Sequence, residues 1–533
     1  MSGKPYGGGL LPPQIQEIAD KTAVLKPLPT QIGVQNQKNK NWLGTNVIFL
    51  QNSKIRFTAV RYNISKKKGV AMYDIQSRWK LEGNILRYYG LRNQPNMFKN
   101  TVKLTKKQKT VVEKLPCDLT DGEINILKNI IGAQIVKFES KRVIPSSLDD
   151  ARFCTTCIAN DFMIPGIEFD AEGRCPICQS ADKTKDLKSI VPIMNSFPRS
   201  KKSRFDVAVF YTGGKDSTYL LYYLSKVLKL RVLALTWEIP YMSECAKISI
   251  ENAKATLDSV EFIIRKISNN DLRSIYGKLY SLSGNTCACP SLAYVLFYPE
   301  LVANKVPYFV AGNEPAQLLG LYFNHMAPQI AYTFSQNKVL NFFLNIGRIL
   351  TLHPPLKKGQ FHTLATMKQL AYGDNKVKNL AGYSNQLVYN ICEAIKEVPN
   401  ILKPLKRAIR TSTWSGNIPA FVQVDFDEIC GGVYEWRKIK DIIVRECGWV
   451  APEEIDKGLH TSCKIEKCKE HSQFTRFYHM KSTMIPFSAL EIAIASRSNH
   501  LSKEEALAEL KSSLGFSLEE IPECAIIRKY IEQ

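Results

Sequence analysis

Residues 205–218 read FDVAVFYTGGKDST. The apolar run VAVFY is short and rich in β-branched and aromatic residues, so it predicts a buried strand. The amphipathic residues 219–230 predict a helix with Ser217 or Thr218 near its start. Two glycines between a strand and a helix N-terminus let backbone amides approach an anion, which the helix dipole also favours. The stretch therefore predicts a phosphate site.

This loop differs from the GxxxxGK[ST] phosphate loop, because Lys215 follows the glycines directly and Asp216 follows the lysine. It resembles the SGGKDS loop of the PP-loop ATP pyrophosphatases, with Thr212 in place of the first serine. The resemblance implies that ATP is cleaved between its α- and β-phosphates. AMP then passes to a substrate oxygen and pyrophosphate is released. The alternative is a strand, a turn and a helix that carry two glycines by chance.

Predicted strands at 207–211, 231–237, 260–264 and 307–311 alternate with predicted helices at 217–229, 243–257, 270–281 and 292–302. This alternation predicts an α/β fold with a doubly wound parallel sheet, of the PP-loop or HUP-like kind, whose ligands bind at the carboxyl ends of the strands. Three loops are therefore expected to converge on one crevice, unless the second and third are plain turns. They contain Thr212 to Thr218, then Thr236, Trp237 and Glu238, and then Gly312, Asn313 and Glu314.

Two CxxC pairs, separated by seventeen residues, precede this core. They consist of Cys154, Cys157, Cys175 and Cys178. Four thiolates at this spacing suit a tetrahedral, structural Zn²⁺ site of zinc-ribbon type, with no open coordination position. The segment between them, IPGIEFDAEGR, predicts a short hairpin with Gly173 in its turn. Cysteine pairs of this kind indicate metal rather than disulfides, and a reducing compartment.

The chain of 533 residues is long enough for several domains. We expect a flexible leader (1–45), a basic β-rich N-terminal domain (46–150), a zinc-knuckle segment (151–200), the PP-loop ATPase core (201–330), and a mostly helical C-terminal part that completes the active site (331–533). One helix is expected at 121–131. Residues 340–350, LNFFLNIGRIL, are apolar enough for either a core helix or a partner-docking face.

Charge is concentrated in residues 1–150, which hold 25 Lys/Arg against 11 Asp/Glu, out of a net charge of +23 for the whole chain. Such a region suits an anionic partner, namely RNA, an acidic carrier protein or a membrane, and a solvated lysine-rich surface is the alternative. No apolar stretch is long enough to span a bilayer and no secretory signal is recognised, so a cytoplasmic location is expected.

Residues 150–515 resemble the N-acetyl sugar amidotransferases, PP-loop enzymes of surface-polysaccharide and nonulosonate biosynthesis. The segments that carry the resemblance are CTTC…IPGIEFDAEGRCPIC, YTGGKDSTY, LTWEIPYMSECAKISIENAKATL, CACPSLAYVLFYPELVANKVPYFVAGNEPA, GWVAPEE and IASRSNHLSKEEALAEL. The resemblance is loose from 320 to 440, and residues 1–150 have no counterpart in that family. CxC and NEP also stand here where the family has CxxC and ENP.

The resemblance implies an enzyme that adenylates a carbonyl or amide oxygen of a nucleotide- or lipid-linked acetamido sugar, after which ammonia from a glutaminase subunit displaces AMP. It assigns catalysis to Lys215, Asp216 and Ser217, with Lys215 offsetting phosphate charge and Asp216 helping to hold Mg²⁺. ATP would be held by Thr212, Gly213, Gly214, Asp216, Ser217 and Thr218. Thr236 and Trp237 would lie near adenosine, and Gly312, Asn313 and Glu314 near the reacting centre.

Cys287 and Cys289, in GNTCACPS, are expected at the carboxyl edge of the sheet. PP-loop tRNA thiolases hold cysteines at a similar place, and some bind a [4Fe–4S] cluster through three thiolates. This makes a sulfurtransferase, acting on tRNA or on a carrier-bound amide through an Fe–S cluster or a persulfide, the alternative function. Candidates for a third ligand are Cys463 first, and then Cys430 and Cys468. The other interpretations are a second zinc site, completed by His460 and by Cys463 or Cys468, and inert buried thiols.

A third hypothesis is a non-enzymatic RNA- or membrane-binding protein with a degenerate loop. The intact GGKDS sequence disfavours it. The oligomeric state is left open.

Overall fold

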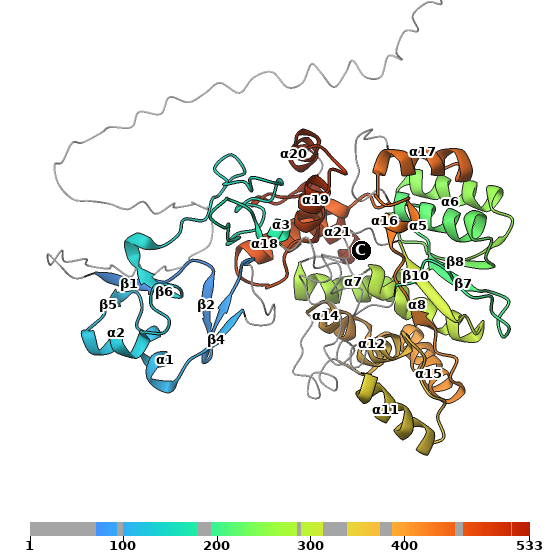
Figure 1. The fold of residues 1–533 in the computed structure, drawn as a ribbon, viewed down its shortest axis with the longest axis horizontal. Helices are drawn as coiled ribbons and strands as arrows, with labels where there is room; N and C mark the ends of the chain where they lie inside the picture. Colours follow the sequence, from blue (N-terminus) through green and yellow to red (C-terminus); the bar gives the residue numbers. More distant parts are fainter. Residues whose placement is uncertain are drawn as a thin grey trace, which may run out of the picture. The chain divides into compact units, whose positions relative to one another are not determined.

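The computed structural model describes residues 71–92, 100–179, 193–284, 289–312, 338–373, 386–452, 462–512 and 514–533, all of which belong to one compact unit (Figure 1). The expected leader, and the first part of the expected N-terminal domain up to residue 70, lie outside these residues. Figure 1 shows the central sheet with helices on both sides.

Five parallel strands form the central sheet, in the order β11-β10-β7-β8-β9. They are β7 Val207–Phe210, β8 Val232–Trp237, β9 Val260–Arg265, β10 Tyr308–Ala311 and β11 Ala420–Phe421. The first strand along the chain, β7, lies in the middle of the sheet, and β8 and β9 follow outward on one side of it. The chain then crosses to the other side of β7, where it adds β10 and finally β11 at the edge. The order reverses between β7 and β10, which is where doubly wound sheets bind their ligands.

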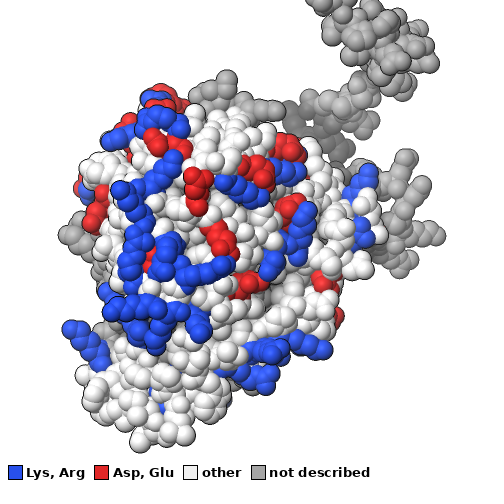
Figure 2. Space-filling model, turned by 90° about the vertical axis from the view of Figure 1, so that its right-hand side faces the viewer, with Lys and Arg blue, Asp and Glu red and all other residues white. Residues whose placement is uncertain are grey.

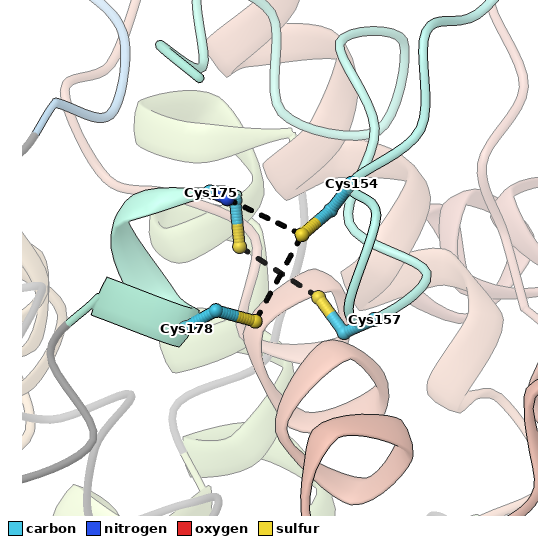
Figure 3. A group of neighbouring side chains, drawn as sticks. All are labelled: Cys154, Cys157, Cys175 and Cys178. Atoms are coloured by element: carbon cyan, nitrogen blue, oxygen red, sulfur yellow. Dashed lines mark hydrogen bonds between the residues drawn. The ribbon is translucent and has the colours of Figure 1, made fainter. Parts of the chain in front are cut away.

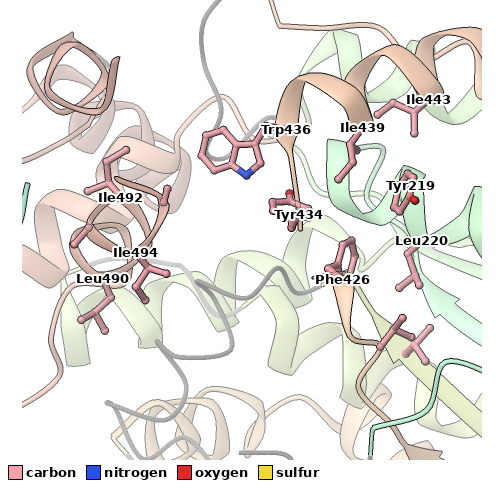
Figure 4. Close-up of a cluster of buried hydrophobic side chains, with 14 of the residues drawn as sticks. Tyr219, Leu220, Phe426, Tyr434, Trp436, Ile439, Ile443, Leu490, Ile492 and Ile494 are labelled. Atoms are coloured by element: carbon pink, nitrogen blue, oxygen red, sulfur yellow. The ribbon is translucent and has the colours of Figure 1, made fainter. Parts of the chain in front are cut away.

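Alternate residues of β7 enter two separate cores, as the period of two in a strand requires. Val207 and Val209 belong to the core shared with α5 Lys215–Tyr222, α6 Glu244–Thr256, α17 Trp436–Cys447 and α19 Phe487–Arg497. Ala208 and Phe210 belong to the core shared with α7 Asn269–Ser283, α8 Cys289–Ala303, α12 Gln360–Tyr372, α14 Gln386–Ile395 and α15 Pro399–Ser415. Figure 4 shows part of the first core, where Ile439 of α17 lies beside Tyr219 of α5. The doubly wound α/β fold is therefore confirmed.

The four predicted strands are confirmed to within one or two residues, and the fifth, β11, was not predicted. The helix after the loop begins at Lys215, with Gly214 as its N-cap, so Ser217 and Thr218 lie in its first turn, as expected. After Tyr222 it continues as a π-helical turn, η4 Tyr223–Val227. The helix predicted at 121–131 ends earlier, as α2 Asp121–Leu127.

Residues 72–140 form two antiparallel sheets of three strands, in the orders β5-β1-β6 and β2-β3-β4. Their elements are β1 Met72–Ile75, β2 Trp79–Glu82, β3 Ile85–Tyr88, β4 Thr101–Lys103, α1 Lys106–Val112, β5 Cys117–Asp118, α2, β6 Ile135–Lys137 and the 3-10 helix η2 Phe138–Ser140. The buried Arg78 joins them to the helix α18 Glu466–Tyr478, because its guanidinium donates to the backbone oxygens of Phe477 and Tyr478 over 2.5 and 2.6 Å.

The remaining helices are α3 Pro176–Gln179, α11 Lys338–Leu350, α16 Phe426–Ile429, α20 Lys503–Ser512 and α21 Pro522–Glu532. Residues 164–174 contain no strand pair, so the hairpin predicted there was wrong. They form a tight turn in which Gly173 has φ +76° and the Asp170 amide donates to the Arg174 oxygen over 3.0 Å. Among the described residues, none of the helices has both the length and the apolar character needed to cross a bilayer.

Candidate functional site

The loop that follows β7 turns sharply at Gly213. Its φ of +73° lies in the left-handed region, which glycine adopts without strain. A Cβ at this position would lie 2.4 Å from the backbone oxygen of Ala246 in α6, so there is no room for a side chain either. The indole N–H of the buried Trp449 donates to the Gly213 oxygen over 3.0 Å. The turn is therefore fixed both by α6 and by a residue from the C-terminal part of the chain.

Hydroxyl groups close the loop onto the start of α5. Ser217 Oγ lies 3.1 Å from Thr212 Oγ1, and it donates to the Gly214 oxygen over 3.0 Å. Thr218 Oγ1 donates to the same oxygen over 2.9 Å. Because α5 begins at Lys215, its first amide groups have no acceptor within the helix. These amides, together with the helix dipole, can bind an anion such as phosphate.

Gly312, at the end of β10, lies directly against this loop. A Cβ on Gly312 would be 2.7 Å from the Ser217 amide nitrogen and 2.8 Å from Ser217 Cα. The first and third of the three predicted loops are thus adjacent, and glycine keeps the space next to the Ser217 amide free of a side chain. Asn313 and Glu314 lie outside the described residues.

Lys215 is only 1 % exposed, although it is a charged residue. Its ammonium lies 2.5 Å from Asp216 Oδ1 and contacts the Tyr434 hydroxyl, which in turn donates to the same carboxylate oxygen. The ammonium also lies 4.8 Å from the ring centroid of Trp436. Lys215 and Asp216 therefore face the segment before α17 in this structure, and their expected contacts with phosphate and Mg²⁺ stay predictions.

His500, which follows α19, completes this buried cluster. Its ring lies 5.2 Å from the Tyr434 ring, edge to face. Burial, together with the positive charges of Lys215 and Arg497, lowers the pKa of His500 to about 4. The imidazole is therefore neutral at physiological pH, which suits a site that already holds a buried ammonium.

The second predicted loop begins with two buried residues at the end of β8. Thr236 is 1 % exposed, and its hydroxyl donates to the Tyr211 oxygen, next to the phosphate loop, over 2.9 Å. Trp237 is 7 % exposed, and its indole nitrogen has no hydrogen-bond partner among the described residues. Glu238 forms an ion pair of 2.7 Å with Lys266. Thr236 thus joins the first two loops, while the contact of either residue with adenosine stays a prediction.

The four cysteines of the CxxC pairs converge at one point (Figure 3). Their sulfur atoms all lie within 4.8 Å of one another, with Cys154 and Cys178 3.8 Å apart and Cys157 and Cys175 3.6 Å apart. A tetrahedral site with metal–sulfur bonds of about 2.3 Å requires sulfur separations of about 3.8 Å. The donor set and its geometry therefore fit Zn²⁺.

Backbone amides also point at these sulfur atoms. The Thr156 and Cys175 amides donate to Cys154 Sγ over 3.4 and 3.2 Å, and the Ala159 amide donates to Cys157 Sγ over 3.4 Å. Hydrogen bonds from Cys157 and Cys175 hold the pKa of Cys154 below its usual range. Such bonds favour thiolates, which are the form that binds metal.

The cysteine cluster is part of the same core as α19, and two side chains join it to the C-terminal helices. Arg497 donates to the Ile177 oxygen over 2.9 Å, and Lys503 donates to the Thr155 oxygen over 3.0 Å. A metal bound by the four thiolates would therefore stabilise the packing of this segment rather than act on a substrate.

The other predicted cysteines are divided between two places. Cys463 pairs with Met242, just after β8, and shares a small apolar cluster with Cys468 and Cys524. A hydrogen bond with Cys468 lowers the pKa of the Cys524 thiol. Cys430 lies elsewhere, beside Tyr219 of α5, and burial raises its pKa to about 11. Of the three candidates for a third ligand, Cys463 and Cys468 thus lie together and Cys430 does not.

Cys289 is the first residue of α8, which ends five residues before β10. A helix that leads directly into a parallel strand runs back along the sheet, so α8 begins at the carboxyl edge, as expected for Cys289. Cys287 and His460 lie outside the described residues.

The residues that sequence reasoning missed are Tyr434, Trp436, Trp449, His500 and Cys524. All of them lie more than 200 residues after the loop, and no local pattern connects them to it. Trp449 had a partial signal, because GWVAPEE belongs to the resemblance described above. Nothing in the sequence indicated that Tyr434 and Trp436 enclose Lys215.

No protein-family model and no curated protein sequence match this chain. Among solved structures, the chain is similar to the U34-tRNA thiolase NcsA from Methanococcus maripaludis with its [4Fe-4S] cluster. The TM-score is 0.19 at 13 % sequence identity, and the match covers 50 % of this chain and 86 % of that chain. No family model therefore supports the expected amidotransferase family.

Proposed function

We propose that this chain is an ATP-dependent enzyme of the PP-loop ATP pyrophosphatase type, which transfers AMP to an oxygen of its substrate and releases pyrophosphate. The observation that carries the proposal is the glycine-lined loop at the switch point of a doubly wound sheet, where Gly213 and Gly312 stand at two positions beside the start of α5 that have no room for a side chain. A site of this kind suits the polyphosphate of a nucleotide.

In the proposed first step, a carbonyl or amide oxygen of the substrate attacks the α-phosphorus of ATP. The new bond joins this oxygen to phosphorus, and the bond to the β-phosphate breaks. The chain contributes by positioning: the amides of Ser217 and its neighbours bind the departing pyrophosphate, and the hydroxyls of Thr212 and Ser217 keep the loop closed. Mg²⁺, when bound, offsets phosphate charge, and Asp216 is the nearest carboxylate in the loop.

The products formed from ATP test this step. With a reactive acceptor present, AMP and pyrophosphate should form in equal amounts, and an acceptor labelled with ¹⁸O should transfer its label to AMP. Gly312→Ala should lower the rate by about a hundredfold or more, because its Cβ would displace the Ser217 amide. Gly122→Ala is the matched control, since nothing lies within 4 Å of a Cβ there. Release of ADP instead of AMP would contradict the proposal.

In the second step an incoming group displaces AMP, and the sequence leaves open whether this group is ammonia-derived nitrogen or sulfur. Sulfur is favoured by the cysteines near the carboxyl edge of the sheet. Cys463 pairs with Met242 in the segment after β8 and has Cys468 and Cys524 beside it, and Cys289 begins a helix at the same edge. Hydrogen sulfide, or a donor that delivers it, would attack the adenylated carbon. A carbon–sulfur bond would form, the carbon–oxygen bond would break, and AMP would leave with the oxygen. The amidotransferase alternative differs only in that ammonia attacks.

A comparison of the two donors, sulfide and ammonium, distinguishes the sulfurtransferase from the amidotransferase. Anaerobically purified protein is supplied with ATP, and bulk tRNA or a nucleotide-linked acetamido sugar serves as the acceptor, with either sulfide or ammonium. A sulfurtransferase should incorporate sulfur, and Cys463→Ser should reduce incorporation while Cys430→Ser, the control at the other location, should not. Nitrogen incorporation that is unaffected by Cys463→Ser would assign the chain to the amidotransferases.

A further inference from the structure

Helix α11 presents an apolar face to solvent. No residue of this helix is buried. The side chains at helical spacing on one side are between 37 % and 78 % exposed, and we call them the apolar face: Val339, Phe342, Phe343, Ile346, Ile349 and Leu350. Leu344, on the opposite side, packs against the core that contains α12 and α15. Soluble proteins rarely expose contiguous apolar patches of this kind unless the patch binds something.

The segments that form and adjoin this face are rich in basic residues and lack acidic ones. Residues 338–372 and 399–418 together contain nine Lys/Arg and no Asp/Glu. Seven of the nine are exposed, and we call six of these seven the basic rim: Lys338, Lys357, Lys358, Lys403, Arg407 and Arg410. Lys403, Arg407, Arg410 and the exposed Trp414 share one face of α15, because they are spaced four, three and four residues apart.

The rim and the face belong to one surface. Arg348 of α11 donates to the Thr413 oxygen over 3.2 Å, and the His353 and Trp414 rings lie 4.4 Å apart, so the end of α11 is joined to the end of α15. In Figure 1, α11 and α15 form the lower end of the molecule, and the lower end of Figure 2 is the same end, because the view is turned about the vertical axis. At that end Figure 2 shows a region without charged side chains, bordered above by a band of Lys and Arg.

We propose that the apolar face of α11 and the basic rim form a docking surface for an anionic lipid bilayer. The aromatic and aliphatic side chains would enter the boundary between headgroups and acyl chains, with the helix lying in the plane of the interface. The lysines and arginines would lie at the level of the negative headgroups, and Trp414 suits the same depth. This surface is distinct from the phosphate loop, so the proposal does not depend on the reaction there.

Charge favours a bilayer over the other possible occupants. A second copy of the chain, related by a two-fold axis, would bring two basic rims together with no acidic residue of these segments to balance them. A nucleic acid would pair with the rim but would leave Phe342, Phe343 and Ile349 in water, since phosphate contacts use only the basic side chains. A bilayer that contains anionic lipid satisfies both sets of residues at once.

Co-sedimentation of the full chain with vesicles tests the proposal. We expect binding to vesicles of phosphatidylcholine mixed with phosphatidylglycerol, weaker binding to phosphatidylcholine alone, and a decrease with added salt. Phe342→Ser with Phe343→Ser should lower the partition coefficient by on the order of tenfold for each phenylalanine. Lys403→Gln, Arg407→Gln and Arg410→Gln should each lower it by about fivefold.

Matched controls separate this surface from the basic N-terminal part of the chain. Val143→Ser changes an apolar residue that is 88 % exposed elsewhere, and Lys106→Gln with Lys107→Gln removes two exposed charges from α1. Neither control should change vesicle binding. The proposal is overturned if mixed vesicles are not bound, or if only the α1 variant loses binding. It is also overturned if light scattering shows a dimer that Phe342→Ser with Phe343→Ser dissociates while vesicles are ignored.

Discussion

The phosphate loop and helix α11 both depart from the usual burial of side chains, the loop by burying a charged residue and α11 by exposing apolar ones. At the loop, a lysine is 1 % exposed and lies between a tyrosine and a tryptophan. On α11, two phenylalanines are more than 60 % exposed and no residue of the helix is buried. Charged residues are ordinarily outside and large apolar residues inside, so each region departs from what folding alone would select.

The physical cost differs between the two regions. Burial of an ammonium is unfavourable unless a counter-charge and hydrogen bonds compensate, and Asp216 and Tyr434 provide these at the loop. Exposure of phenylalanine in α11 costs little folding free energy, because the unfolded chain exposes it as well. Substitutions at the loop should therefore change stability, whereas substitutions on the apolar face should change binding only.

The largest effect is expected from Asp216→Asn, which leaves the Lys215 ammonium buried without a counter-charge. We expect a loss of about 3 to 5 kcal/mol in the free energy of unfolding, measured by urea denaturation. Glu251→Gln is the control, because it replaces the same kind of group in the exposed ion pair with Lys254 and should cost less than about 0.5 kcal/mol. Equal losses in the two variants would mean that Lys215 is solvated and that the contrast with α11 does not hold.

Sequence reasoning predicted those parts of the loop region that are encoded locally. The strand at 207–211, the glycine turn and the following helix lie within about twenty residues, and their order along the chain is enough to predict the parallel sheet and its crevice. The cysteine cluster could be predicted from spacing, because each CxxC brings two sulfur atoms to one side of a turn. β11 has two residues, too few to show a period.

The environment of Lys215 could not be predicted in this way, because Tyr434 and Trp436 reach it across more than 200 residues of chain. The exposure of α11 could not be predicted either. Its amphipathic pattern is the same for a helix packed on a core and for one that docks on a partner, and only the packing of α12 and α15 decides which side faces water.

A smaller effect is expected from Tyr434→Phe, which removes the hydroxyl that contacts both Lys215 and Asp216. The ion pair remains, so we expect a loss of about 2 kcal/mol by urea denaturation. Tyr298→Phe serves as a control in which a buried tyrosine loses a neutral partner, Ser412, at 2.8 Å, and it should cost about 1 kcal/mol. A Tyr434→Phe protein as stable as the unaltered chain would show that the hydroxyl does not compensate the buried charge.

A further effect concerns pH, because the pKa of His500 is lowered from 6.5 to about 4 by burial and by Lys215 and Arg497. Between these values the unfolded chain binds a proton that the folded chain does not. Stability is therefore complete above pH 6.5 and decreases as the pH falls towards 4, by about 1 kcal/mol for this residue after allowance for solvent screening.

Urea denaturation at several pH values should show a weaker decrease in His500→Gln. Part of the loss of stability at low pH should remain in this variant, because burial lowers the pKa of His362 to about 4 as well. His479→Gln, at an exposed position, should leave the profile unchanged. An identical pH profile for His500→Gln would mean that this imidazole is solvated and is not part of the buried cluster around Lys215.

The smallest change in stability is expected on the apolar face. Phe342→Ser with Phe343→Ser should alter the free energy of unfolding by less than about 0.5 kcal/mol, whereas Phe297→Ala, at a fully buried position in α8, should cost about 3 to 5 kcal/mol. A loss of 2 kcal/mol or more in the double variant would mean that another segment of the chain or a second copy covers the face in solution. An unchanged stability together with lost vesicle binding would show that the two phenylalanines act on a partner and not on the fold.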